Sequence, residues 1–269
     1  MSKNEYFCIS TLRNMRFNII NISELESTNS YAQKQIENNA LHEGDVIFTF
    51  CQNEGKGQGG NSWESEIGSN LTISIVLEPN MIYASQQFVL TQLISLAIIE
   101  LIKKQLLVNK SNNDVKIKWP NDIYVGDNKI AGILFQNFIK GNAIEHSIVG
   151  IGINVNQKEF FSSAPNPISI IHFANKLTDV NELLNELLLN VGTNYEKYVF
   201  ESNFIELKLE YLKNLYKYNI WANYTDRNGV FEGKIIDVDE FGRLIVEHNG
   251  GDKKMYMYKE IQFKTVAIL

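Results

Sequence analysis

The chain has little cysteine, little proline and few histidines, and each shortage excludes a class of protein. Its 269 residues include four prolines, four histidines and two cysteines, Cys8 and Cys51. Two distant cysteines give neither a zinc-ligand spacing nor a disulfide framework, and this usage suits a reducing compartment. The histidines form no short-spaced ligand pair. The N-terminus also lacks a basic region followed by an apolar run, so we expect a cytoplasmic protein.

Positive charge is scarce as well. The formal net charge is −6 at pH 7, whereas a general nucleic-acid binder normally carries a basic face that exchanges counterions with phosphates. We therefore expect no DNA binding. The most apolar stretch, residues 88–107, is interrupted by Gln92, Ser95, Glu100 and two lysines. That is too polar for the centre of a bilayer, so the sequence predicts a core helix and no membrane partner.

With 44% apolar and 21% charged residues, the chain can bury one large core, or one core and a small module. Periodicity and turn signals predict an α+β fold with a mixed, mainly antiparallel sheet. The strand over residues 71–75 alternates apolar and polar residues, which is typical of a half-buried strand. The predicted strands are 46–50, 71–75, 115–119, 123–125, 130–135 and 147–155, and the predicted helices are 28–37, 88–107, 180–199 and 202–216.

From Trp221 onward the pattern changes to short strands separated by glycine and aspartate. This spacing predicts a small β-barrel of roughly 50 residues. We place the boundary near Tyr218, which gives a larger domain over residues 1–218 and a barrel domain over residues 219–269.

The segment Lys118-Trp119-Pro120-Asn121-Asp122 concentrates cations, an amide and a carboxylate around one turn. Such a turn can hold a phosphate and its metal. A hairpin follows, because Gly126-Asp127-Asn128 supplies turn chemistry and Lys129 starts the return strand. For an isolated motif, an edge strand with surface lysines is an equally good interpretation.

A glycine-rich loop, Gly55-Lys56-Gly57-Gln58-Gly59-Gly60, contains the pattern G-x-G-x-x-G after a strand. A dinucleotide fingerprint also needs a crossover helix, and residues 61–70 leave no room for one before the next strand. What remains is a mobile loop that can close over an anion through its amides and Lys56. A flexible surface loop is the alternative, but it explains Trp63 poorly.

Gly150 and Gly152 lie on one face of a predicted strand, beside Asn154. Glycine in a strand marks the close approach of a ligand or another backbone, or a packing bulge. The earlier triplet Ser27-Thr28-Asn29 is either a site element or only a helix cap and first turn.

Taken in order, these motifs resemble the biotin protein ligases. The matching segments are Glu24–Asn29, Gln52 with the glycine loop and Trp63, Lys118–Asp122, Lys129–Leu134 and Gly150–Asn154. The C-terminal β-module is similar in kind. The resemblance implies a fold related to lipoate ligases and to the catalytic domains of class II aminoacyl-tRNA synthetases, with an SH3-like barrel at the C-terminus.

The resemblance also implies a two-step reaction. Biotin attacks the α-phosphate of Mg-ATP to give biotinyl-adenylate, and a lysine of a biotin carboxyl carrier domain then attacks the anhydride. Two anions must approach each other, so the site needs cations. The expected substrates and cofactor are biotin, ATP and Mg²⁺, the expected macromolecular partner is the carrier domain, and a homodimer remains open.

By position in the matched motifs, the resemblance assigns a role to each residue of the candidate site. The catalytic cations are Lys129, Lys56 and Lys118. The residues for biotin are Ser27, Thr28, Asn29, Gln52, Lys56, Gly57, Gln58, Lys129, Gly132, Gly150 and Gly152. The residues for ATP and the adenylate are Gln58, Trp63, Lys118, Asn121, Asp122, Lys129 and Asn154, with Asp122 as the metal contact. Outside the matched motifs, Lys264, near the C-terminal Glu260-Ile261 pair, is a further candidate for the nucleotide.

The chain departs from the family pattern in two respects. The family's loop is commonly rich in arginine, whereas Lys56 is the one cation here and Gln58 stands where an arginine is frequent. About two dozen residues precede the Ser-Thr-Asn motif, too few for the N-terminal DNA-binding segment of some bacterial members. The alternatives are a lipoate or octanoate ligase or transferase, and a non-catalytic biotin-responsive regulator.

Overall fold

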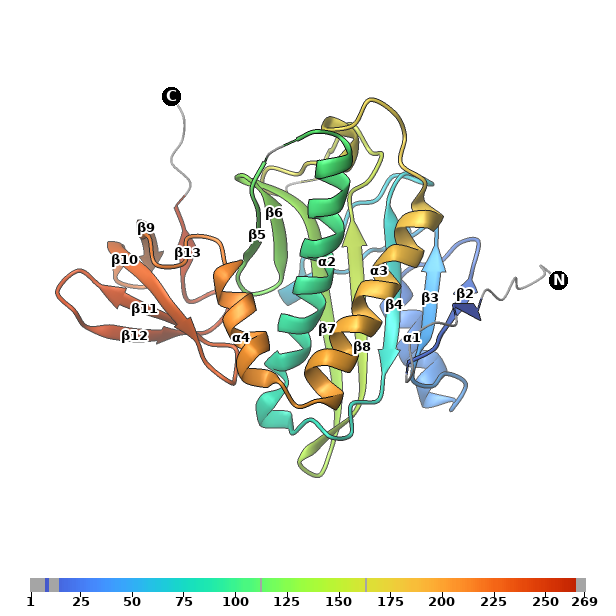
Figure 1. The fold of residues 1–269 in the computed structure, drawn as a ribbon, viewed down its shortest axis with the longest axis horizontal. Helices are drawn as coiled ribbons and strands as arrows, with labels where there is room; N and C mark the ends of the chain where they lie inside the picture. The colour runs from blue at the N-terminus through green and yellow to red at the C-terminus, as the bar shows by residue number, and fades with distance from the viewer. Residues whose placement is uncertain (1–7, 10–14, 112, 163, 265–269) are drawn as a thin grey trace.

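An eight-stranded sheet forms the centre of the protein in our computed structural model, which describes residues 8–9, 15–111, 113–162 and 164–264 (Figure 1). The strand order is β1-β2-β3-β4-β8-β7-β6-β5, and every neighbouring pair is antiparallel except β2 and β3. The sheet is therefore mixed and mainly antiparallel, as predicted. Its strands are β1 (Cys8–Ile9), β2 (Phe17–Asn21), β3 (Asp45–Thr49), β4 (Leu71–Leu77), β5 (Val115–Lys118), β6 (Asp122–Val125), β7 (Asn128–Lys140) and β8 (Ala143–Ile153).

Helices cover both faces of this sheet. In Figure 1, α2 (Phe88–Val108), α3 (Val180–Tyr195) and α4 (Phe204–Lys213) lie in front of it, while α1 (Thr28–Glu37) lies behind. Successive side chains of a strand point to opposite faces, so both faces of β3 are apolar and both need a cover. Val46 and Phe48 pack into the core on the α2 side, and Ile47 packs into a second cluster with Ala32 of α1. A π-helical turn, Glu196–Phe200, extends α3 toward α4.

Helix α2 is the core helix that its sequence predicts. With the short turn before it, residues 84–108 are long and apolar enough to cross a membrane, but 72% of the apolar window is buried inside the protein. The helix packs against α3, α4 and the sheet. Apolar residues around its whole circumference are therefore explained by burial on all sides.

The prediction that β4 is half-buried was wrong. All seven of its residues are buried, including the polar Thr72 and Ser74. The polar residues of β4 bond to protein groups instead of water: Ser74 donates a hydrogen bond to Thr28 at the N-terminus of α1, and Thr72 donates one to the Thr49 carbonyl of β3. Alternation in the sequence therefore marked a polar contact inside the protein.

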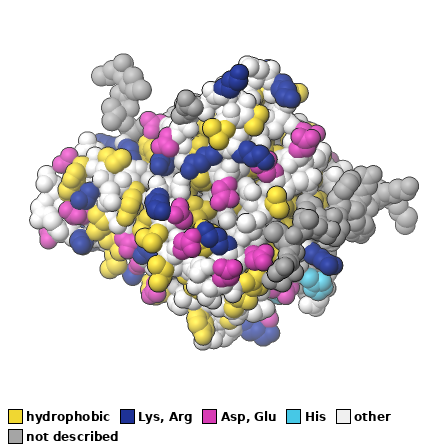
Figure 2. Space-filling view, viewed as in Figure 1, with side chains coloured by type: hydrophobic (Ala, Val, Ile, Leu, Met, Phe, Trp, Pro, Cys, Tyr) yellow, Lys and Arg dark blue, Asp and Glu magenta, His cyan; other side chains and the backbone are white. Residues whose placement is uncertain are grey.

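The C-terminal residues form a separate antiparallel sheet of five strands in the order β12-β11-β10-β9-β13. It begins at Trp221, just after the predicted boundary at Tyr218, and Figure 2 shows hydrophobic side chains over this module among charges of both signs. Trp119 donates a hydrogen bond of 2.9 Å to the Gly242 carbonyl and so ties the module to the main domain. The strands are β9 (Trp221–Asp226), β10 (Gly229–Val238), β11 (Leu244–His248), β12 (Lys253–Tyr256) and β13 (Gln262–Phe263).

Candidate functional site

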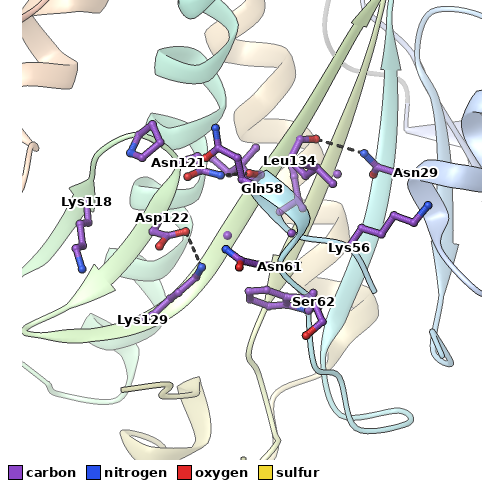
Figure 3. Close-up of a pocket in the computed structure, with 18 of the residues that line it drawn as sticks. Asn29, Lys56, Gln58, Asn61, Ser62, Lys118, Asn121, Asp122, Lys129 and Leu134 are labelled. Carbon is purple, nitrogen blue, oxygen red and sulfur yellow. Dashed lines mark hydrogen bonds and ion pairs between the residues drawn. The ribbon is translucent and has the colours of Figure 1, made fainter. Parts of the chain in front are cut away.

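The predicted motifs meet around one cavity of about 420 Å³ (Figure 3). Its wall combines the start of α1, the glycine loop, the turn after β5, the centres of β7 and β8, and the C-terminal segment 258–263. The sequence-predicted residues that line it are Ser27, Thr28, Asn29, Gln52, Lys56, Gly57, Gln58, Trp63, Lys118, Asn121, Asp122, Lys129, Gly132, Gly150 and Gly152.

Asn154 and Lys264, both predicted to face the nucleotide, do not line this cavity. Asn154 lies just beyond β8, where its side-chain amide donates to the Ile168 carbonyl at 3.1 Å and fixes the loop that follows. Lys264 follows β13, and its backbone N–H donates to the Asn223 carbonyl. Phe263, one residue earlier, lines the cavity instead.

The start of α1 forms a connected polar wall. Ser27 caps the helix, and both the backbone N–H and the hydroxyl of Thr28 donate to Gln52 Oε1, at 2.9 and 3.2 Å. Behind them, the buried Ser74 lies 2.8 Å from Thr28 Oγ1 and 2.6 Å from Asn29 Oδ1. These side chains are held in place by one another, so the wall can present donors and acceptors in fixed directions.

The strand glycines accommodate protein side chains as well as the cavity. A Cβ at Gly150 would lie 2.1 Å from Asn29 Oδ1, so this glycine makes room for the polar wall. A Cβ at Gly152 would lie 2.3 Å from Trp63 Cε2, and one at Gly132 would lie 3.1 Å from the same indole. Gly132 and Gly152 are cross-strand partners, and the indole rests on the bare patch they form.

Lys129 and Asp122 form an ion pair at the opposite side of the cavity. Lys129 Nζ lies 2.6 Å from Asp122 Oδ1, and both side chains are only about one fifth exposed, at 22% and 23%. The hairpin between β6 and β7 brings them together, as its turn residues predicted. A cation and a carboxylate side by side in a half-enclosed site can bind a phosphate and the metal that accompanies it.

Lys118 lies beside this pair in an aromatic setting. Its ammonium donates to the Tyr124 hydroxyl at 3.0 Å and lies 4.5 and 5.4 Å from the ring centroids of Tyr124 and Phe263. Burial lowers the pKa of Lys118, while the nearby Asp122 carboxylate acts in the opposite direction. A cation that water solvates poorly is well suited to an incoming anion.

Lys56 does not join the other two lysines. Its side chain lines the cavity, but its ammonium donates to Ser30 Oγ on α1 at 2.7 Å and points away from Lys129 in Figure 3. Gln58 of the same loop also lines the cavity, and its buried Oε1 has no hydrogen-bond partner in the part of the chain that the structure describes. The predicted trio of cations is therefore a pair, Lys129 and Lys118, in this conformation.

The sequence analysis missed several contributors. It placed Ser74 on a half-buried strand without a role at the site, although Ser74 supports the polar wall. It gave no site role to Tyr258, Gln262 and Phe263, which line the cavity. Only the alternation of polar residues in the strand around Ser74 could have flagged it. The described residues contain no group of three His, Cys, Asp or Glu side chains that could hold a metal. Asp122 therefore fits a magnesium ion only in the company of substrate phosphates, which is the usual arrangement for this cation.

Comparisons with known proteins agree with this geometry. Residues 22–154 match the Biotin/lipoate A/B protein ligase family, and residues 223–264 match the Biotin protein ligase C terminal domain. The chain is 31% identical over 240 residues to the bifunctional ligase/repressor BirA of Bacillus subtilis, covering 86% of this chain and 70% of the relative. It is 27% identical over 223 residues to the human biotin--protein ligase, covering 78% and 29% of the two chains.

Solved structures show the same fold. The biotin protein ligase from Aquifex aeolicus in complex with biotin and ATP superposes with a TM-score of 0.74 at 23% identity, covering 91% of this chain and 98% of that one. The Leishmania major enzyme in complex with biotinyl-5-AMP gives 0.60 at 21%, covering 89% and 98%. The two family-model matches and the relative that is 31% identical over most of both chains lead to one conclusion: this chain belongs to the biotin protein ligase family.

Proposed function

We propose that this chain activates biotin with ATP and transfers it to a lysine of a biotin carboxyl carrier domain. The observation that carries the proposal is the cavity itself, which has an uncharged polar wall at one side and the Lys129–Asp122 pair with Lys118 at the other. A neutral ureido ring needs donors and acceptors in fixed directions, and the Thr28–Gln52–Ser74 network supplies them. The carboxylate of biotin and the phosphates of ATP need cations, and Lys129 and Lys118 lie across the cavity from the polar wall.

The chemistry follows from this division. A carboxylate oxygen of biotin bonds to the α-phosphorus of ATP, and the bond to pyrophosphate breaks. Lys129 and Lys118 offset the negative charge that builds up as the two anions meet. In the second step, the carrier lysine, as a free amine, attacks the acyl carbon and AMP leaves. Magnesium, held by Asp122 and phosphate oxygens, would neutralise the departing pyrophosphate.

A lipoate or octanoate substrate is the second candidate, because the matching family includes ligases for both cofactors. An aliphatic chain would leave the network of Gln52 with the buried Thr28 and Ser74 without a polar ligand, which is unfavourable in a half-enclosed site. The match to a biotin protein ligase C-terminal domain also favours biotin.

The test is to incubate the protein with ATP, Mg²⁺ and either biotin or lipoate, and to detect the acyl-adenylate by mass spectrometry. We expect biotinyl-adenylate, and biotinylation of an added carrier domain. A lipoyl-adenylate as the sole product would refute the proposed substrate.

Asp122→Asn tests the metal contact, because it removes a charge and keeps the size of the side chain. We expect it to shift the magnesium titration of adenylate formation to higher concentration, whereas Asp114→Asn, at an exposed carboxylate just before the neighbouring strand β5, should leave the titration unchanged. Identical titrations in Asp122→Asn and the wild type would remove Asp122 from the metal site.

A further inference from the structure

The C-terminal module contacts the glycine loop directly, through a residue 200 positions further along the chain. Lys259 Nζ donates a hydrogen bond of 2.8 Å to the carbonyl of Gly59, at the tip of the loop. The neighbouring Tyr258 also lies against the loop, because its ring is 3.0 Å from the position that a Cβ of Gly59 would take. Two adjacent residues of the module thus contact the tip of the loop.

The loop is shaped for this contact. Gly59 has a φ of +67°, and a Cβ there would lie 2.8 Å from both Cε and Nζ of Lys259 and 3.0 Å from the Tyr258 ring. A side chain at this position would therefore be strained and would also displace the lysine. Only glycine allows the ammonium to approach the loop backbone this closely.

The module is shaped for it as well. Lys259 has a φ of +72°, a backbone region that a long side chain rarely adopts. The turn that imposes it is closed on both sides, since Glu260 donates its backbone N–H to the Met257 carbonyl and accepts the Met257 N–H on its carboxylate. An unfavourable conformation that is held by its surroundings points to a role for the side chain it presents.

We propose that Lys259 is a positioning residue that fastens the glycine loop over the cavity, so that the C-terminal module sets how firmly the loop closes on a bound ligand. The loop's own cation, Lys56, bonds to α1, and Gln58 carries no charge. The module therefore supplies the charge that the loop tip lacks. The consequence for catalysis, slower escape of biotinyl-adenylate, rests on the proposed function, but the contact itself does not.

Hydrogen exchange of the ligand-free protein tests the contact without any assumption about activity. The peptide over residues 55–63 contains the amides of Gly57 and Trp63, which bond to the carbonyls of Asn61 and Gly55 within the loop. In Lys259→Met we expect this peptide to exchange roughly fivefold faster, because one charge-assisted hydrogen bond is lost. Lys253→Met, an exposed lysine of the same module, is the matched control and should match the wild type.

Loop exchange at the wild-type rate in Lys259→Met would overturn the proposal. If Lys259→Met instead speeds hydrogen exchange throughout β9 to β12, the Lys259→Arg variant separates a loss of the contact from a loosened module. Arginine keeps the charged donor, so the proposal requires wild-type exchange in the loop, and faster loop exchange with an intact module would refute it.

A second measurement addresses the ligand. We expect biotinyl-adenylate to dissociate severalfold faster from Lys259→Met, followed by stopped flow, with little change in its rate of formation at saturating substrates. Equal dissociation rates would show that the fastening does not govern retention. Failure to form any adenylate in the wild type would instead refute the proposed function, and the exchange result would still stand.

Discussion

Three lysines at one cavity have three different surroundings, and these differences decide what each can do. Lys129 is paired with Asp122, Lys118 lies between two aromatic rings, and Lys56 is bonded to α1. The sequence could place all three at the site, because motif order fixes which segments meet. The sequence could not show which way the flexible side chain of Lys56 points. Its partner Ser30 is an ordinary helix residue in the sequence, with nothing that marks it as a hydrogen-bond acceptor for Lys56.

We expect Lys129→Ala to lower the rate of adenylate formation by about 10²- to 10³-fold, because it removes charge stabilisation from a half-enclosed site. Pyrophosphate release measures the effect. Lys140→Ala is the control, because Lys140 lies on the same strand and also forms an ion pair, with Glu145, but is 78% exposed. A Lys129→Ala variant with near-normal release would be incompatible with the assigned role.

Lys118→Met should stabilise the protein while it impairs nucleotide use. The folded pKa of Lys118 lies below its ordinary value of 10.5, so the protonated side chain disfavours folding at neutral pH. This cost is complete below the folded pKa and disappears as the pH rises above 10.5. We therefore expect Lys118→Met to raise the melting temperature at pH 7 by roughly 2 °C.

Lys116→Met, on the same strand, serves as the control and should produce no such rise. Calorimetry at pH 7 measures both variants. A lower melting temperature for Lys118→Met would mean that its hydrogen bond to Tyr124 outweighs the cost of burying the charge.

At the scale of elements, strands β7 and β8 provide a cavity floor that is bare of side chains at Gly132, Gly150 and Gly152. The sequence predicted the glycines as space for a ligand, but protein side chains share that space, because Asn29 lies against Gly150 and Trp63 against Gly152. Periodicity and turn chemistry are local, so they revealed the strands and the hairpin. Contacts between segments far apart in the chain have no local signal, and neither the place of Trp63 nor the burial of Ser74 could be predicted.

Gly152→Ala should displace Trp63 and weaken biotin binding by about tenfold or more, since overpacking a filled site costs roughly 1–3 kcal/mol. The added Cβ would otherwise lie 2.3 Å from the indole. Calorimetric titration with biotin measures the effect. Adding Trp63→Ala to Gly152→Ala should cost much less than Trp63→Ala alone, because the two changes act on one contact. Strictly additive costs would show that Gly152 acts independently of the indole.

The whole molecule has two sheets, and both contribute to its larger hydrophobic cluster. Tyr224, Ile235 and Val246 of the module belong to the same cluster of buried side chains as α2 and α4. The sequence revealed the change of pattern near Tyr218, because strand spacing changes there. It gave no sign of how far the two parts share buried surface, which depends on the shapes of both faces.

We expect Ile235→Ala, at a fully buried position of β10, to lower the stability of the entire chain by about 2–5 kcal/mol. Thermal unfolding should remain a single transition at a lower temperature, because both parts depend on one core. Val230→Ala, on the same strand but 59% exposed, should have little effect. Two separate transitions, of which only one moves, would show that the module unfolds by itself.

The position of Trp63 gives the protein an optical probe of its own. The indole lies on bare backbone, and its buried Nε1 has no hydrogen-bond partner among the described residues. Trp119 bonds to Gly242, and Trp221 is 43% exposed on the module. The three emitters therefore have distinct environments, and Trp63 is the one that lies against the strand glycines of the cavity floor. The emission wavelength of the protein's intrinsic fluorescence therefore reports whether the Trp63 ring lies on the cavity floor.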